Sequence, residues 1–403
     1  MSVSYNERAK LFARNVQDQL RSEHRPKAIL SVLGNEALKK VEAQGGGYVA
    51  SVPTVKAGSL NSGNVQDTDL TTPFATTGNS IVVETMKVDE VDSFHDKLAT
   101  EQLSKETAIA SLSAQFARER SQQLEQKREV DFVSNYVRTH INNFVNGLHT
   151  TLDEEVLLGA TTFSLSESDG VEAGDIAYIG TKTQQGAEKT IAILIKSIAG
   201  SLVTIETDKA LFPKGGVQGT KEQFKKLEII LPAIEAGAKV VVDVPTEIEA
   251  KDLYDLIVDL ETKVGEQDVP ESNLFIHGSP RVLKLLKKTD SPFVKFENFA
   301  KSLSSICNNI VKKGKIKEFE DSTIIQNTNG MQRKVQGTDR YYIQLFKGNY
   351  SINTISWIKS VDSDKIGGTA GQGHSISGLQ IYGSEVFEQG ARAMATLIVT
   401  IKQ

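Results

Sequence analysis

Gln44-Gly-Gly-Gly-Tyr-Val-Ala-Ser-Val-Pro-Thr-Val55 and Ile81-Val-Val-Glu-Thr-Met-Lys-Val88 enclose a nearly uncharged segment rich in Gly, Ser, Thr and Asn. Their β-branched residues, bounded by Gly and Asn, predict two strands at 48–55 and 81–88. Paired antiparallel, they form a long ribbon with a polar tip. Because an isolated two-stranded ribbon is marginal in water, this one needs another surface to lie on. The alternative is a disordered linker between two domains.

Helical patterns flank this ribbon on both sides. Residues 4–42 carry two apolar stripes broken near Pro26 and Gly34, which predicts a helical arm that docks on another surface. After the ribbon, residues 89–95 predict a turn rich in capping residues. From about 97 to 148 apolar residues recur at spacings of three and four, which predicts a long spine helix. Its charged residues mix both signs, as is typical of a solvated or salt-bridged face.

Strand-rich and mixed patterns follow. Short strand-like runs with Gly-containing turns over 156–212 predict a small β module with a hairpin at Ala199-Gly200. Residues 226–336 predict an α/β unit. In it a capping box at Thr246-Glu-Ile-Glu249 opens one helix, and Ser279-Pro280 begins another. The strand-like runs of this unit are 227–231, 239–244 and 273–277.

The tail is β-rich from Arg340 onward. A glycine-rich loop is expected over 362–378. The strand-like runs of the tail are 341–346, 379–382 and 395–401.

The composition is that of an ordinary folded soluble protein, with 403 residues, 39% hydrophobic and 24% charged. This length predicts two or three cores, or one elongated subunit with insertions. The formal net charge of −5 predicts no general attraction to nucleic acid. The single cysteine, Cys307, excludes an intrachain disulfide and zinc sites built from several cysteines, and its setting favours a small buried thiol over a nucleophile.

No pattern predicts an active site, so the chain is expected not to be an enzyme and to carry no catalytic, cofactor or metal site. There is no Gly-x4-Gly-Lys-Ser/Thr phosphate loop and no His-Glu-x-x-His helix. Residues 367–373 resemble a phosphate loop only by their number of glycines, and 373–377 lack the last glycine of a nucleophile elbow. The N-terminus shows no signal core and no run is long enough to span a bilayer, which predicts assembly in a cytoplasm.

In the order of its elements the chain resembles the major capsid proteins of tailed bacteriophages, the Hong Kong 97-type shell fold. Two phrases are the most family-like, Asn273-Leu-Phe-Ile-His-Gly-Ser-Pro280 and Gly314-Lys-Ile-Lys-Glu-Phe-Glu-Asp-Ser-Thr-Ile-Ile325, although the order of all elements carries the likeness. The resemblance implies an α+β fold. The implied divisions are an N-terminal arm (1–43), an extended hairpin loop (44–88), a peripheral domain with the spine helix (89–155), a β-rich insertion (156–220), an axial domain (221–377) and the return strands of the peripheral domain (378–403).

The resemblance implies a major capsid protein that self-assembles into hexamers and pentamers of an icosahedral shell enclosing double-stranded DNA. The implied partners are a separate scaffolding protein, because the arm is too short to be a fused one, and a portal protein. Packaged DNA would lie on the inner face without sequence specificity. A decoration protein is a further candidate partner, and no membrane is expected. The implied location is the virion capsid, assembled in the host cytoplasm.

Three alternatives stay open. A nanocompartment shell protein of the same fold would show a cargo-binding groove near the arm. A phage tail or baseplate structural protein would form rings or tubes but no closed shell. A hydrolase or transferase built on residues 225–330 is the third, although no nucleophile and base are visible there.

Contacts between subunits are expected on the ribbon and on the spine. The candidate residues are Gly45, Gly46 and Gly47, where the loop leaves the arm; Val52, Val55, Val82 and Met86 on the strands; and Arg118, Arg120, Lys127 and Arg128 on the spine, as partners in salt bridges. The alternative for the glycines is an ordinary flexible turn. Lysine–asparagine cross-linking occurs in one branch of the family, but it is not expected here, because Lys56 and Lys87 lie on the strands and not at the tip.

Overall fold

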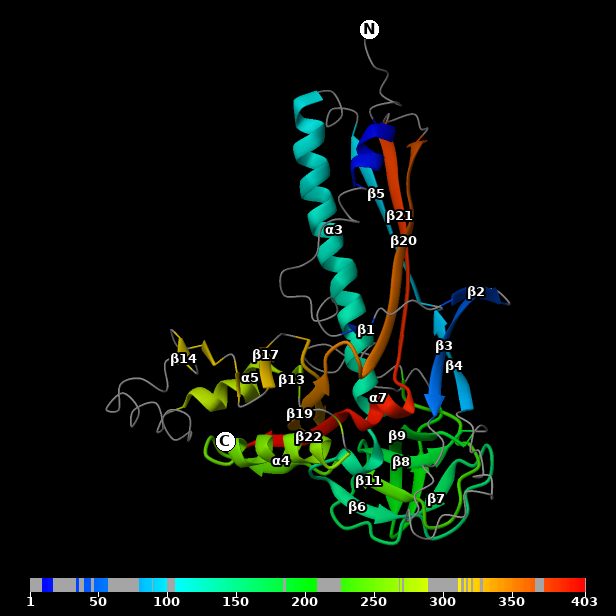
Figure 1. The fold of residues 1–403 in the computed structure, drawn as a ribbon, viewed down its shortest axis with the longest axis vertical. Coiled ribbons are helices and arrows are strands. Elements are labelled where there is room, and N and C mark those ends of the chain that lie inside the picture. The colour runs from blue at the N-terminus through cyan, green and yellow to red at the C-terminus, as the bar shows by residue number, and fades with distance from the viewer. Residues whose placement is uncertain are drawn as a thin grey trace, which may run out of the picture.

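The computed structural model has an elongated α+β fold, with one long limb above two packed lobes (Figure 1). The limb is built from one long helix and long strands. One lobe is rich in strands, and the other combines helices with a mixed sheet. The residues described are 9–16, 34–35, 40–44, 47–56, 80–88, 90–99, 106–183, 186–208, 226–267, 269, 272–288, 311–312, 315–316, 318–319, 322–326, 329–366 and 373–402.

The limb places helix α3 beside a long sheet (Figure 1). The strand order of the sheet is β1-β20-β21-β5. Residues 9–16 form a short helix that packs against α3 and the sheet of the same chain, with Phe12 and Val16 buried. The bounds are α3 (Glu106–Ser134), β1 (Gly34–Asn35), β5 (Glu90–Ala99), β20 (Ile352–Ile366) and β21 (Gly373–Glu385).

Three predictions for the limb were wrong. Residues 89–95, expected as a turn, lie mostly in β5, and α3 begins at Glu106 rather than near 97. The glycine-rich loop expected over 362–378 is largely strand, because β20 and β21 continue their pairing to Ile366 and Gly373. In both places long-range strand pairing prevails over local turn propensity. The helical pattern after Ser134 continues as two 3-10 turns, η2 (Asn135–Arg138) and η3 (Ile141–Asn143).

The predicted ribbon is present. Strand β3 (Gly47–Lys56) pairs antiparallel with β4 (Ser80–Val88), and the register places Tyr48 opposite Val88 and Val55 opposite Ile81. A third strand, β2 (Lys40–Gln44), joins β3. This part of the arm is therefore a strand, and the prediction of a helix was wrong here. The base of the ribbon is fixed to the limb, since Met86 and Val88 pack with Ile381 in one buried cluster.

The strand-rich lobe is a six-stranded antiparallel sheet in the order β6-β11-β8-β9-β10-β7. The predicted hairpin turns at Gly200, whose φ of 63° favours glycine. The lobe extends beyond the β module expected over 156–212, because 148–151 and 239–242 supply two of its strands. The bounds are β6 (Leu148–Thr151), β7 (Thr162–Ser164), β8 (Ile176–Lys182), β9 (Glu188–Ala199), β10 (Leu202–Ile205) and β11 (Lys239–Val242).

The other lobe packs helices on a mixed sheet in the order β12-β22-β19-β13-β17-β16, with β18 beside β19. Ser279 caps helix α5 as predicted, by accepting a hydrogen bond from the Arg281 amide. The capping box at Thr246 was wrong: Thr246–Ile248 form a strand, and α4 begins at Leu253. The bounds are β12 (Thr246–Ile248), α4 (Leu253–Gly265), β13 (Leu274–Gly278), α5 (Pro280–Leu283), η6 (Lys284–Lys287), β16 (Glu318–Phe319), β17 (Ser322–Gln326), β18 (Gln332–Val335), β19 (Thr338–Lys347), α7 (Glu388–Arg392) and β22 (Met394–Ile401). Strands β14 (Val311–Lys312) and β15 (Lys315–Ile316) pair separately.

The lobes share a core because their strands are apolar on both faces. Along β19, Ile343 and Leu345 pack with helix α4, whereas Tyr342 and Phe346 pack with the end of α3 and with the other lobe. Successive strand residues point to opposite faces, so one continuous apolar run serves two cores. Strand β8 does the same, since Tyr178 belongs to the shared core and Ile179 to the interior of the strand-rich lobe.

Candidate intersubunit surfaces

Most of the ribbon residues expected at subunit contacts lie in its strands. Gly47 begins β3 opposite Gln44, and Gly45 and Gly46 lie outside the described residues. Val52, Val55 and Val82 lie in the paired strands, opposite Glu84, Ile81 and Thr54. Met86 is 0% exposed and packs inside its own subunit. Met86 therefore has no surface left for a neighbour, and its expected role is corrected to anchoring the ribbon.

Arg120 on the spine has a partner within the chain. Its Nη2 lies 2.6 Å from Asp96 Oδ1 on β5, and its guanidinium lies over the Phe116 ring at 5.3 Å. This ion pair fastens the helix to the limb sheet within one subunit, and a salt bridge from Arg120 to a neighbouring subunit stays a prediction. Arg118 and Lys127 are exposed and Arg128 is half-buried, and each also interacts within the chain.

Breaking the Arg120–Asp96 pair should cost a modest amount of stability. The pair is partly buried and its distance is short, so its charge-assisted hydrogen bond should contribute more to stability than the median surface salt bridge does. A double-mutant cycle of Arg120→Ala and Asp96→Ala, followed by urea unfolding, should give a coupling energy of about 1 kcal/mol. The same cycle on the exposed pair Lys263 and Glu266, 3.3 Å apart, should give about 0.3 kcal/mol. A coupling energy no larger than that of this reference pair would show that the Arg120–Asp96 pair does not fasten the helix to the limb sheet.

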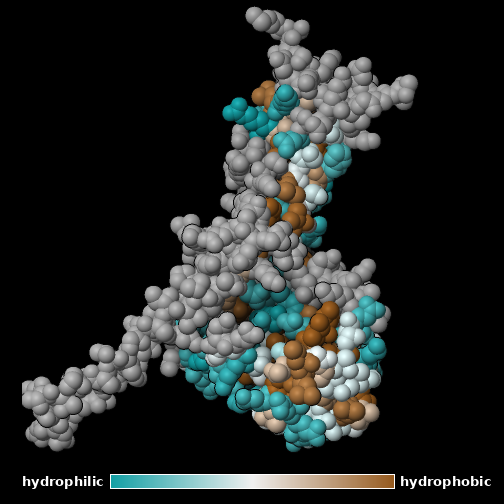
Figure 2. All heavy atoms as spheres, turned by 90° about the vertical axis from the view of Figure 1, so that its right-hand side faces the viewer, coloured by the Kyte–Doolittle hydropathy of each residue, from teal (hydrophilic) through white to brown (hydrophobic). Residues whose placement is uncertain are grey.

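Large apolar side chains are exposed on the strand-rich lobe, and the sequence analysis did not single them out. Leu157, Leu158 and Ile230 are 69%, 76% and 63% exposed. The segments that carry them are adjacent, because the Gly159 amide donates to the Leu231 carbonyl at 2.9 Å. Figure 2 shows apolar surface on this lobe. The detectable signal was the pair Leu157-Leu158 directly before Gly159, an apolar pair at a turn.

A buried ionic cluster joins the two lobes. Asp243, at the end of β11, lies 3.1 Å from Arg340 and 3.4 Å from Arg333, both from the sheet of the other lobe. Asp175, before β8, lies 2.9 Å from Arg340. Tyr342 donates to Asp243 Oδ2 at 2.5 Å. All four charged side chains are at most 5% exposed, and their formal charges cancel.

The cluster gives stability a defined pH dependence. Burial, followed by the charge of Asp243, raises the pKa of Asp175 from 3.8 to about 6. The folded state keeps the Asp175 carboxyl protonated up to a higher pH than the unfolded state does. The contribution of Asp175 to stability is therefore full below pH 3.8 and is lost as the pH rises to about 6. The free energy of unfolding of Asp175→Asn, measured with urea between pH 3.5 and pH 7, should therefore decline less over this window than that of the unsubstituted chain. Parallel pH profiles for the two proteins would show that the pKa of Asp175 is not raised in the folded state.

In the part of the chain that the structure describes, no group of three or more His, Cys, Asp or Glu side chains is placed to hold a metal ion. None of the helices among these residues is long and apolar enough to cross a bilayer. Cys307 lies outside the described residues, as do most of the glycines of 367–373.

Searches against family models and curated proteins gave no match. Solved structures similar to this chain include "Mycobacterium phage Che8", at 11% identity and a TM-score of 0.42, covering 88% of this chain and 84% of the other. "Capsid of Ralstonia phage GP4" is 13% identical with a TM-score of 0.43, over 94% and 93%. "Capsid structure of the Cyanophage P-SCSP1u" is 9% identical with a TM-score of 0.44, over 94% and 90%. With each TM-score below 0.5, the function is inferred from the chain's own architecture.

Proposed function

We propose that this chain is a major capsid protein of a tailed bacteriophage, with the Hong Kong 97-type shell fold and no catalytic role. Copies of the chain form hexamers and pentamers of an icosahedral shell that encloses double-stranded DNA. The capsid assembles in the host cytoplasm with a separate scaffolding protein and a portal protein, and a decoration protein is a further candidate partner. The DNA lies on the inner face without sequence-specific contacts, and no membrane takes part.

The observation that carries the proposal is the limb with its attached ribbon. The two lobes complete their cores with each other and with the end of α3, and the limb has separate apolar clusters around Phe94 and around Met86. A long helix on a narrow sheet, with a three-stranded ribbon beside it, adds reach and surface (Figure 1). Such elements are suited to contact several neighbouring copies, and closed symmetry then combines many modest interfaces into a stable assembly.

In the proposed shell the divisions of the chain take the roles that the sequence suggested, with two changes of membership. Strand β22, expected among the return strands of the peripheral domain, lies in the sheet of the α/β lobe, and β20, expected in the axial domain, lies in the limb sheet. The α/β lobe is the axial part at the centre of each ring, and the limb with α3 is the peripheral part. The ribbon, with Gly47, Val52, Val55 and Val82, lies over a neighbouring subunit. The strand-rich lobe is the insertion, with its limits moved to 148 and 242 by the strands that join it.

The test is electron microscopy of the purified chain, alone and co-expressed with its genomic neighbours. Closed icosahedral shells, or rings of five and six, are expected. Shells filled with protein cargo would indicate the nanocompartment alternative, and tubes would indicate the tail alternative. A chain that stays monomeric or dimeric under every condition would contradict a shell role.

A shortened ribbon separates the role of this element from that of the whole chain. Replacing residues 57–79 with an Asn-Gly turn retains the pairing between β3 and β4 and removes only the connection beyond them. The variant should fold, as shown by an unchanged circular dichroism spectrum, but should not close shells. Leu202→Ser on the strand-rich lobe is the control and should leave assembly intact. If the shortened variant assembles normally, the ribbon does not bind a neighbour.

A further inference from the structure

The turn that carries Leu157 and Leu158 is held in place on the outside of the strand-rich lobe. Val156, the residue before it, exchanges two backbone hydrogen bonds with Ile234, so their segments pair antiparallel. Val156 and Ile234 are both buried in the interior of the lobe. Because successive residues of paired segments point to opposite sides, Leu157 points away from this interior.

The exposed apolar side chains on this surface form a group. Ile230 lies on the segment that pairs with the turn, since the next residue, Leu231, accepts the Gly159 amide. We call Leu157, Leu158 and Ile230 the leucine patch, and all three are exposed. Single exposed apolar residues are common on soluble proteins, whereas a group on adjacent segments is typical of a contact site.

Carboxylates border the leucine patch on one side. Three of them precede the patch in the chain, and a fourth follows Ile234 directly on the paired segment. All of them are exposed, and they are Asp153, Glu154, Glu155 and Glu235. The surface therefore combines an apolar part with a strongly acidic part.

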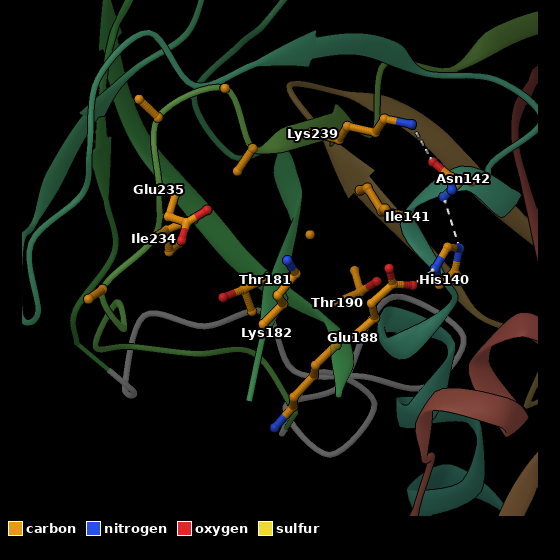
Figure 3. A pocket seen from close by; sticks show the side chains of 16 residues that line it. His140, Ile141, Asn142, Thr181, Lys182, Glu188, Thr190, Ile234, Glu235 and Lys239 are labelled. Atoms are coloured by element: carbon orange, nitrogen blue, oxygen red, sulfur yellow. Dashed lines mark hydrogen bonds and ion pairs between the residues drawn. The ribbon is translucent and has the colours of Figure 1, made fainter. Parts of the chain in front are cut away.

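Lysines near this border lie beyond the paired segment. Figure 3 shows Glu235 across a hollow from Lys239, with Lys182 between them. The segment 233–237 forms one wall of this hollow, and its pairing with the chain around Val156 is on the side opposite to β8. Residues 153–155 are therefore separated from the lysines of the hollow by this wall.

The charges favour a basic occupant over a second copy of the chain. Two copies joined patch to patch would bring the same four carboxylates together, and like charges opposed across an interface disfavour binding. A segment that carries apolar side chains beside Lys or Arg complements both parts of the surface. Since the chain has a formal net charge of −5, it also attracts such a segment at longer range.

The spacing along the chain defines the arrangement of the occupant. Glu154 and Glu155 precede Leu157 and Leu158 by two to four positions, which is at most roughly 13 Å in an extended chain. In an extended occupant, the basic side chains should therefore lie about two to four positions from the apolar ones.

We propose that the leucine patch and its acidic border bind a short basic segment of a separate protein. Two or three apolar side chains of the segment cover the patch, and its Lys or Arg residues face the carboxylates. The apolar contacts supply affinity, and the opposite charges supply speed of association and selectivity. This inference goes beyond the proposed function, because the site belongs to the folded chain and does not require a shell.

The test uses the unassembled chain and the fluorescein-labelled peptide Leu-Leu-Ser-Ser-Arg-Lys-Arg, with binding followed by fluorescence anisotropy. Saturable binding is expected. The acidic analogue Leu-Leu-Ser-Ser-Glu-Glu-Asp should bind at least about tenfold more weakly, because its charges are reversed. The analogue Ser-Ser-Ser-Ser-Arg-Lys-Arg keeps the charges but has no apolar side chain, and it should weaken binding to a similar extent.

The double variant Leu157→Ser with Leu158→Ser tests the apolar part. It should bind the basic peptide about tenfold or more weakly, because the apolar contact surface is lost. Val91→Ser is the control, since Val91 is an exposed apolar residue on the limb and is 55% exposed. That variant should bind as the unsubstituted chain does, and circular dichroism should show that both variants fold.

A reversal of charge tests the acidic border. Glu154→Lys with Glu155→Lys should weaken binding of the basic peptide about tenfold or more and should allow the acidic analogue to bind. Glu119→Lys with Glu247→Lys makes the same change in net charge at exposed positions on α3 and β12, and should leave both affinities unchanged.

Four outcomes would overturn the proposal. They are no binding of the basic peptide, equal binding of either analogue, equal effects of the patch variants and their controls, and self-association of the unassembled chain that Leu157→Ser with Leu158→Ser abolishes. The last outcome would identify a second copy of the chain as the occupant. All of these measurements use the unassembled chain, so their failure is distinguishable from a failure to form shells.

Discussion

Asp243→Ala should lower the free energy of unfolding by about 3–5 kcal/mol, because it removes one partner from a buried ion pair. Asp243 is 0% exposed and its Oδ1 accepts the Ile176 amide at 2.7 Å and lies 3.1 Å from Arg340. Without it, two arginines share the single carboxylate of Asp175 in the interior. The hydroxyl of Tyr342 and the amide of Ile176 also lose their acceptor.

The measurement is urea unfolding of the unassembled chain at pH 7, followed by circular dichroism. Asp339→Ala is the matched control, because Asp339 is 50% exposed and its pair with Arg281 spans 3.5 Å. That substitution should change stability by less than about 1 kcal/mol. If Asp243→Ala costs no more than the control, the cluster does not hold the two lobes together.

The cluster also shows where sequence reasoning stopped. Arg333 and Arg340 flank a turn at Gln336 and Gly337, and in the sequence they resemble ordinary surface charges. Their partners Asp175 and Asp243 lie 90 to 165 residues earlier, beside strands β8 and β11, which the sequence assigned to two different units. Charge pairs of this separation carry no local periodicity, so only the folded topology reveals them.

Elements with strong local signals were predicted well. The β3–β4 ribbon and the Ser279-Pro280 helix start were found because β-branched runs and capping chemistry are local. Strand β11 was assigned to the α/β unit and not to the strand-rich lobe, because an apolar run does not indicate which strands it pairs with. Of the candidate interface residues, Met86 was misjudged, because a sequence does not distinguish an outward face from one covered by the same chain.

Gly378→Ala should destabilise the limb by about 2–3 kcal/mol, because there is no room for a methyl group at this position. Gly378 lies directly opposite Phe94 in the pairing of β21 with β5. A Cβ there would stand 2.2 Å from Phe94 Cζ and 2.3 Å from Cε1. The Phe94 ring also packs edge to face against Phe116 at 5.8 Å, so a shift of the ring that makes room for the methyl group disturbs this contact.

A double-mutant cycle identifies the ring as the cause. When Phe94 is already alanine, adding Gly378→Ala should cost less than about 1 kcal/mol, because the methyl group then enters vacated space. Ser377→Ala, at the preceding position of the same strand, is the control for a change in strand propensity. Equal costs of Gly378→Ala with and without Phe94 would show that backbone freedom, and not the ring, requires glycine here. The same ring contacts the cluster that holds residues 9–16 against α3, so hydrogen exchange of that helix should rise in Gly378→Ala.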